Sequence, residues 1–256
     1  MFLEVFMTFF VNLSTTHDYS IDETAGAFVQ ICNQHSNSCL QSMPGFFQNW
    51  TNYAWVMAQF HTNYVSVIQP YKLGKISTER FLENLSQIFY FMNNMDKSKR
   101  NELLANAWSS SIKLSTNTQN RFGKLVEQAA DEPVYLISNT NELDVRAILN
   151  LLQVNNPDLE WDKETDISII NSKEPIKILP NVYLCLSYRY GSFKEQTATT
   201  ASLLEFISEQ CPGSKTLVSQ FPGDLEKGNL LGLNNVLNAE EFYNSSMSNS
   251  MLKKHQ

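Results

Sequence analysis

The stretch Val134-Tyr135-Leu136-Ile137-Ser138-Asn139-Thr140-Asn141 decides the fold class of this 256-residue chain. Its first four residues are apolar without alternation, which is typical of a strand buried on both faces. A polar turn follows, and Glu142 to Gln153 then has helical spacing of its apolar residues. A strand that runs directly into a helix indicates a parallel sheet with helices packed on its faces.

Three other segments repeat this pattern of an apolar strand followed by polar residues or a helix. We expect the strands at Phe2 to Val11, Val182 to Leu186 and Thr216 to Val218, and helices at Thr197 to Glu209 and Asp224 to Leu231. The predicted fold class is therefore α/β, with a Rossmann-like parallel sheet core. Ligands of such sheets bind at the carboxyl ends of the strands, so the residues that follow each strand are the candidate site.

A long helical segment separates the first two strands. Apolar residues from Phe46 to Gln69 recur at spacings of three and four, and Pro70 is expected to close this helix. Ser77 has the position of a helix N-cap in an arrangement close to a capping box. The sequence predicts a discontinuous α/β core at residues 1–14 and 115–240, a helical cap at 15–114 and a flexible tail at 241–256.

Composition and charge exclude some functions. The net charge is −7 and Lys and Arg form no block, whereas a nucleic-acid binder needs clustered basic residues. No apolar run reaches the roughly 20 residues of a transmembrane helix. Met1 to Leu13 is apolar, but Glu4 interrupts it and no basic segment precedes it, so a strand is favoured over a signal sequence. The four cysteines form no CxxC motif and are expected to be reduced in a cytoplasmic protein.

Several of these features together resemble the haloacid dehalogenase (HAD) superfamily, in its phosphatase-like branch with a helical cap. Gly74-Lys75-Ile76-Ser77 looks like the cap motif, and Ser138 stands where a Ser or Thr of the family binds phosphate. Gly191 to Lys194 is similar to the third motif, whose Lys balances negative charge. The resemblance runs from Phe2 to about Leu233 and implies an α/β core with an inserted helical cap.

The resemblance also implies acids that this chain lacks. At the positions matched to the Asp nucleophile and the Asp acid/base stand Glu4 and Phe6, and Ser219 and Gln220 replace the acids that hold magnesium. A phenyl ring cannot transfer a proton, and neutral oxygens are poor ligands for Mg²⁺. We therefore expect no catalytic residue, no bound metal and no cofactor, and a protein that is not an enzyme.

The remaining polar residues have two interpretations each. Lys194 pairs with Glu4 or points to solvent. Ser138 binds an anion or, as we favour, caps the helix after its strand. Asp224 is a displaced metal ligand or, as we favour, an acid that complements the dipole of the helix it begins.

These features support three hypotheses about function. The first is an inactive HAD-like adaptor or scaffold that binds other proteins through the cap or the polar insertion at 155–180. The second is a weakly active phosphatase that uses Glu4, and the third is a sensor that binds an organic phosphate at Ser138 and Lys194. An Asn-, Lys- and Ser-rich composition suggests a bacterial protein. The whole sequence resembles subunits of a Dot/Icm type IV secretion coupling complex.

Overall fold

The structure is a computed structural model of the chain. It describes residues 7–12, 18–19, 21–35, 45–113, 115–130, 132–156, 174–193, 203–211, 214–219, 222–233 and 235–243. Glu4, Phe6, Lys194 and Gln220 lie outside these residues, as do residues 157–173 of the polar insertion.

A six-stranded sheet forms the core of the α/β part, in the order β5-β6-β4-β1-β7-β8. All neighbouring strands are parallel except β5, which pairs antiparallel with β6. The predicted α/β fold is thereby confirmed. The strands are β1 (Met7–Asn12), β4 (Val134–Ser138), β5 (Ile176–Leu179), β6 (Val182–Leu186), β7 (Ser214–Ser219) and β8 (Asn235–Asn238).

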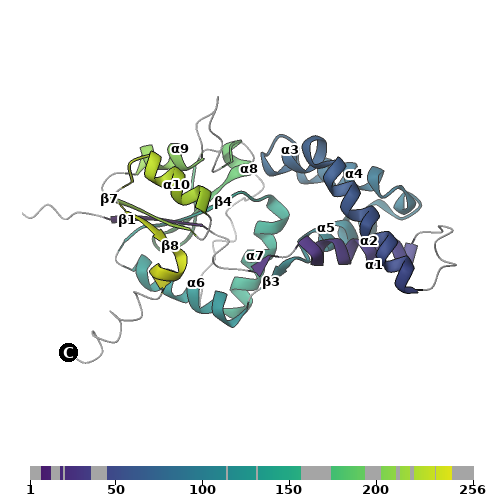
Figure 1. The fold of residues 1–256 in the computed structure, drawn as a ribbon, viewed down its shortest axis with the longest axis horizontal. Helices are drawn as coiled ribbons and strands as arrows, with labels where there is room; N and C mark the ends of the chain where they lie inside the picture. The colour runs from purple at the N-terminus through teal and green to yellow at the C-terminus, as the bar shows by residue number, and fades with distance from the viewer. Residues whose placement is uncertain are drawn as a thin grey trace, which may run out of the picture.

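Helices cover both faces of this sheet, because its strands are apolar on both sides (Figure 1). One face packs against α6 (Thr116–Ala129) and α7 (Glu142–Asn155), and the other packs against α9 (Leu203–Gln210). The short helix α8 (Ser187–Tyr190) follows β6, and α10 (Pro222–Leu230) follows β7. The sequence pattern predicts neither α8 nor β8, because both are short and β8 is rich in Asn.

The helical insertion, described at residues 18–19, 21–35 and 45–113, extends to one side of the sheet (Figure 1). An antiparallel pair of two-residue strands, β2 and β3, joins the two ends of the insertion. Its interior is a cluster of aromatic rings that includes Phe28, Phe60, Phe81, Phe89 and Trp108. Its elements are β2 (Asp18–Tyr19), α1 (Ile21–His35), α2 (Gly45–Thr62), η3 (Tyr64–Ile68), α3 (Gln69–Lys72), α4 (Thr78–Ile88), η4 (Tyr90–Met92), α5 (Lys97–Ser109) and β3 (Ile112–Lys113).

Two predictions about the insertion have different outcomes. Pro70 does not close the long helix: a π-helical turn precedes it, and Pro70 lies in the first turn of α3, where a missing N–H is tolerated. Ser77 is the N-cap of α4, as predicted, and its hydroxyl accepts a hydrogen bond from the Arg80 N–H at 3.3 Å.

The first strand agrees with its prediction where the structure describes it, whereas the C-terminal part of the core differs. β1, Met7–Asn12, ends one residue beyond the strand expected at Phe2 to Val11, and residues 2–6 lie outside the described residues. Along its length β1 pairs with β4 and β7. The predicted flexible tail begins too early: Phe242 and Tyr243 are buried in the sheet core.

Candidate functional site

The carboxyl edge of the sheet brings together polar residues from four strands. Asn12 pairs with Ile137, one residue before Ser138, and Val11 pairs with Val218, one residue before Ser219. Ser219 in turn pairs with Asn238 of β8. Asn12, Ser138, Ser219 and Asn238 are the last residues of β1, β4, β7 and β8. At this edge, which binds ligands in parallel sheets, four strands thus end in polar residues, whereas β6 ends in Leu186.

Ser219 and Asp224 form a buried pair at this edge. The Ser219 hydroxyl donates to Oδ2 of Asp224 at 2.6 Å, and the two residues are 0% and 5% exposed. Asp224 lies in the first turn of α10, where an acid complements the helix dipole. The short turn between β7 and α10 therefore directs a carboxylate back to the end of the strand.

The described residues do not build a magnesium site. Among them, no group of three or more His, Cys, Asp or Glu side chains could hold a metal ion. Asp224 brings one carboxylate to the end of β7, and Ser219 engages one of its oxygens. One carboxylate and one neutral hydroxyl are fewer hard ligands than Mg²⁺ prefers.

Ser138 is buried at the end of β4, but it does not cap the next helix, which was the interpretation favoured from the sequence. The N-cap of α7 is Asn141, whose side-chain oxygen accepts from the Asp144 N–H at 3.1 Å. The Asn141 amide donates to the Asp144 carboxylate at 2.6 Å. Asn141 thus satisfies both the backbone and the side chain of the first turn, and Ser138 is not needed as a cap.

Asp144 is a buried carboxylate in the first turn of α7. Burial raises its pKa from the usual 3.8 to about 6, while the positive charge of Lys72 and the hydrogen bond from Asn141 act in the opposite direction. Lys72 belongs to the insertion, so this carboxylate senses charge from both parts of the chain.

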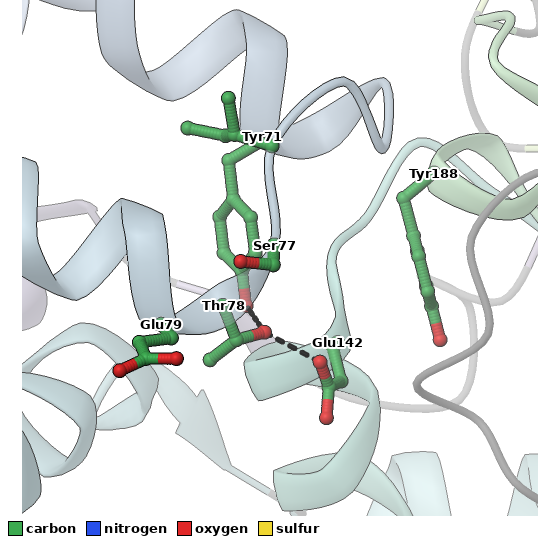
Figure 2. Close-up of a pocket in the computed structure, with 7 residues that line it drawn as sticks. Tyr71, Ser77, Thr78, Glu79, Glu142 and Tyr188 are labelled. Carbon is green, nitrogen blue, oxygen red and sulfur yellow. Dashed lines mark hydrogen bonds between the residues drawn. The ribbon is translucent and has the colours of Figure 1, made fainter.

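A pocket of about 240 Å³ lies where the insertion meets the sheet (Figure 2). We name it the junction pocket; it is lined by Tyr71 and residues 76–79 of the insertion, and by Glu142 and Tyr188 from the segments that follow β4 and β6. Figure 2 shows Glu142 between Thr78 on one side and Tyr188 on the other. Because Glu142 begins the helix that follows Ser138, the pocket borders the carboxyl edge.

Hydrogen bonds join the two walls of the junction pocket. The Thr78 hydroxyl donates to Oε2 of Glu142 at 2.5 Å, and it lies 2.9 Å from the Tyr71 hydroxyl (Figure 2). The Leu143 N–H donates to the Tyr71 oxygen at 3.2 Å. Arg146 forms a salt bridge of 2.7 Å with Oε1 of Glu142, on the other carboxylate oxygen.

The structure brings some of the predicted site residues together. Ser138 and Ser219 end strands at the same edge, as expected from their positions after β4 and β7. Gly191 ends α8 in a left-handed conformation, with φ of 69°. The sequence pattern did not single out Asn12, although a polar residue directly after an apolar run is a signal for the end of a strand. Nor did it single out Thr78 and Glu142 as partners, because they are 64 residues apart.

Comparisons with known proteins support the fold. No family model and no curated protein matches the chain. A solved structure of a HAD family enzyme from Bacteroides thetaiotaomicron aligns with a TM-score of 0.54, at 13% identity over 90% of this chain and 92% of that chain. The same enzyme in complex with magnesium and inorganic phosphate aligns with a TM-score of 0.51, at 14% identity over 90% of this chain and 92% of that chain.

The structure of a predicted HAD-like family hydrolase from Porphyromonas gingivalis aligns with a TM-score of 0.49, at 15% identity over 90% of each chain.

These findings correct one expectation. We expected a protein that is not an enzyme, and this is contradicted because the Bacteroides structures that share its fold are described as HAD family enzymes, with magnesium and phosphate complexes among them.

No helix in the described part of the chain is long and apolar enough to cross a membrane. The topology and the likeness to the Bacteroides structures show that the chain has the fold of HAD family enzymes.

Proposed function

We propose that this chain binds a small organic phosphate at the carboxyl edge of its sheet and hydrolyses the phosphate ester. One observation carries the proposal: Asn12, Ser138 and the Ser219–Asp224 pair all lie at the ends of neighbouring parallel strands. Ligands of open parallel sheets bind at this edge. A HAD family enzyme of the same fold has been solved with inorganic phosphate.

The polar groups at this edge suit a phosphate ester. Hydroxyl groups and backbone N–H groups can donate to phosphate oxygens, and Ser138 supplies a buried hydroxyl beside the helix that starts at Glu142. Contact with an anion is the alternative interpretation of Ser138 given from the sequence. Lys194, the second group of that prediction, stays a prediction because it lies outside the described residues.

The hydrolytic step is proposed with water as the nucleophile. Asn12 is a carboxamide and does not form the acyl phosphate that an aspartate would form. Water attacks phosphorus, the bond from phosphorus to the ester oxygen breaks, and the leaving oxygen takes a proton from solvent water. The protonated Asp224 then releases its proton to solvent, which restores the carboxylate. The Asp224 carboxylate, oriented by Ser219, is the proposed group that takes the proton of water. General base catalysis of this kind contributes typically about 10²–10⁴-fold.

The proposal uses Asp224 instead of Glu4. Glu4 precedes Met7, the first residue of β1, whereas the strand reaches the carboxyl edge at Asn12. The hypothesis of a phosphatase that uses Glu4 stays a prediction, because Glu4 lies outside the described residues.

An assay of the full chain tests this proposal. We expect release of inorganic phosphate from p-nitrophenyl phosphate, and a loss of about 10²-fold or more in Asp224→Asn, which keeps the shape of the side chain but removes the base. Ser138→Ala should raise KM because it removes a phosphate contact. Ser208→Ala is the matched control, since Ser208 is equally buried, 8% exposed, on α9.

Two results would count against hydrolysis. Phosphate that binds, seen by calorimetry, without any turnover would replace the hydrolase with the ligand sensor considered from the sequence. If phosphate neither binds nor is released from the ester, the proposed use of this edge is wrong.

We also propose a protein-binding surface on the insertion as a second candidate function. Trp50 is 67% exposed and Tyr90 is 69% exposed, and exposed aromatic residues are enriched at protein interfaces. Cross-linking of the full chain to its cellular partners should be reduced by Trp50→Ala or Tyr90→Ala and unchanged by Glu127→Gln. Membership of a secretion complex and the role of residues 155–180 stay predictions.

A further inference from the structure

The hydrogen bonds of the junction pocket have a fixed direction. Thr78 has one hydroxyl hydrogen, and it goes to Oε2 of Glu142. The contact between Thr78 and Tyr71 must therefore be donated by the Tyr71 hydroxyl. Burial raises the pKa of Tyr71 far above its usual range, so the phenol keeps this hydrogen and the direction does not reverse near neutral pH.

This direction determines what the pocket offers to a ligand. The hydrogens of Tyr71 and Thr78 are used inside the chain of hydrogen bonds. Arg146 donates to Oε1 of Glu142 from both Nε at 2.9 Å and Nη2 at 2.7 Å, so the acceptor positions that remain are on the Thr78 hydroxyl and on Oε2 of Glu142. Ser77 keeps a hydroxyl hydrogen, since its oxygen only accepts, from Arg80. The walls at Thr78 and Glu142 thus present acceptors, which match a ligand group that carries several donors.

The charges around the pocket also favour a ligand group that carries donors and a positive charge. Two carboxylates, Glu79 and Glu142, line it, and no Lys or Arg is among the lining residues. Both carboxylates have salt-bridge partners, Lys97 and Arg146, but the side chains of these cations are 57% and 51% exposed. Water screens such exposed charges, whereas the Glu142 side chain is only 14% exposed. The lining itself thus holds two carboxylates and no cation, which opposes binding of the phosphate itself.

We infer that the junction pocket binds a small organic ammonium group through Glu142 and Thr78. An ammonium carries three donors and one positive charge, which fit the remaining acceptor positions of Thr78 and Glu142 and a lining that holds carboxylates but no cation. The inference deepens the proposed function and rests on it in one respect: the ammonium would be the part of the substrate that extends from the phosphate ester. The substrate class is then an aminoalkyl phosphate, with its phosphate at Ser138 and its amine at Glu142.

Binding of ethanolamine to the full chain tests the inference without any phosphate. We expect ethanolammonium to bind and to shift NMR signals around Thr78 and Glu142, while ethylene glycol, which replaces the ammonium by a hydroxyl, causes no such shifts. Glu142→Gln should weaken binding about tenfold or more, the size expected when a charged hydrogen bond is lost. Glu127→Gln, which removes the same charge from an exposed site on α6, should leave it unchanged.

A second variant protects the test against misfolding of Glu142→Gln. The Glu79 side chain is 68% exposed, so Glu79→Gln should fold normally and weaken binding about two- to threefold. Equal binding of ethanolamine and ethylene glycol, or undiminished ammonium binding in both variants, would overturn the inference.

The test also separates the two proposals. If ethanolamine binds but the full chain releases no phosphate from any ester, the ammonium site stands and the hydrolase fails. If p-nitrophenyl phosphate is hydrolysed but ethanolamine does not bind, the hydrolase stands and the ammonium site fails.

Discussion

Gly74 of the insertion packs directly against the backbone carbonyl of Tyr188, in the helix that follows β6. A Cβ on Gly74 would lie 1.8 Å from the Tyr188 oxygen, and Gly74 has a φ of 63°. Both the close approach and the left-handed conformation exclude a larger residue. The contact sets the distance between the insertion and the sheet at the side of the junction pocket.

Gly74→Ala should therefore destabilise the chain and separate the insertion from the sheet. We expect a loss of about 1–3 kcal/mol in the free energy of unfolding, from the strained φ and the displaced carbonyl. Urea unfolding measures it. Gly26→Ala is the matched control, because nothing lies within 4 Å of the Cβ there and Ala favours the helix α1. Equal stability of the two variants would show that the close contact does not matter.

Hydrogen bonds of Ser187 also join the insertion to the sheet. Its hydroxyl lies 2.8 Å from the Lys72 carbonyl and 3.0 Å from the Thr140 carbonyl, and it accepts from the Thr140 N–H at 3.0 Å. Ser187→Ala removes the acceptor of the buried Thr140 N–H and should cost about 1–3 kcal/mol. Urea unfolding should show Ser208→Ala to be milder, since that hydroxyl donates only to the nearby Glu205 carbonyl. A loss no larger than that of Ser208→Ala would contradict this role.

Asp144 should make stability depend on pH. Its pKa is raised by burial from 3.8 to about 6, so the folded chain holds a proton that the unfolded chain releases. The free energy of unfolding should therefore fall as pH rises through this interval, and the contribution of the protonated carboxyl is lost above about pH 6. Thermal unfolding between pH 4 and pH 7, a range set by this shift, measures the effect.

Asp144→Asn removes this titration. The variant should be more stable than the natural chain at pH 7 and should show a flatter dependence on pH, because an amide needs no proton to be neutral. Glu127→Gln serves as the exposed control and should keep the natural profile. An unchanged slope in Asp144→Asn would mean that another group titrates.

The secondary structure around β4 and β6 was predictable because it depends on local pattern. Both strands are apolar runs that end at polar or helix-forming residues, and their predicted bounds agree with the structure within one residue. Ser77 was predictable as a helix cap for the same reason. The end of β1 agrees with its prediction within one residue, because polar residues follow the apolar run there.

The candidate site was also predictable from the sequence only in part. Ser138 and Ser219 follow apolar runs, so the sequence alone placed them at the ends of strands, and their common edge follows from the parallel topology. The spacing of apolar and polar residues along the sequence by itself also determined the α/β class and the insertion of a helical segment. Only the tertiary structure joined Thr78 to Glu142 and Gly74 to Tyr188, because such contacts arise when two separately folded surfaces pack. No local periodicity encodes which of their residues will meet.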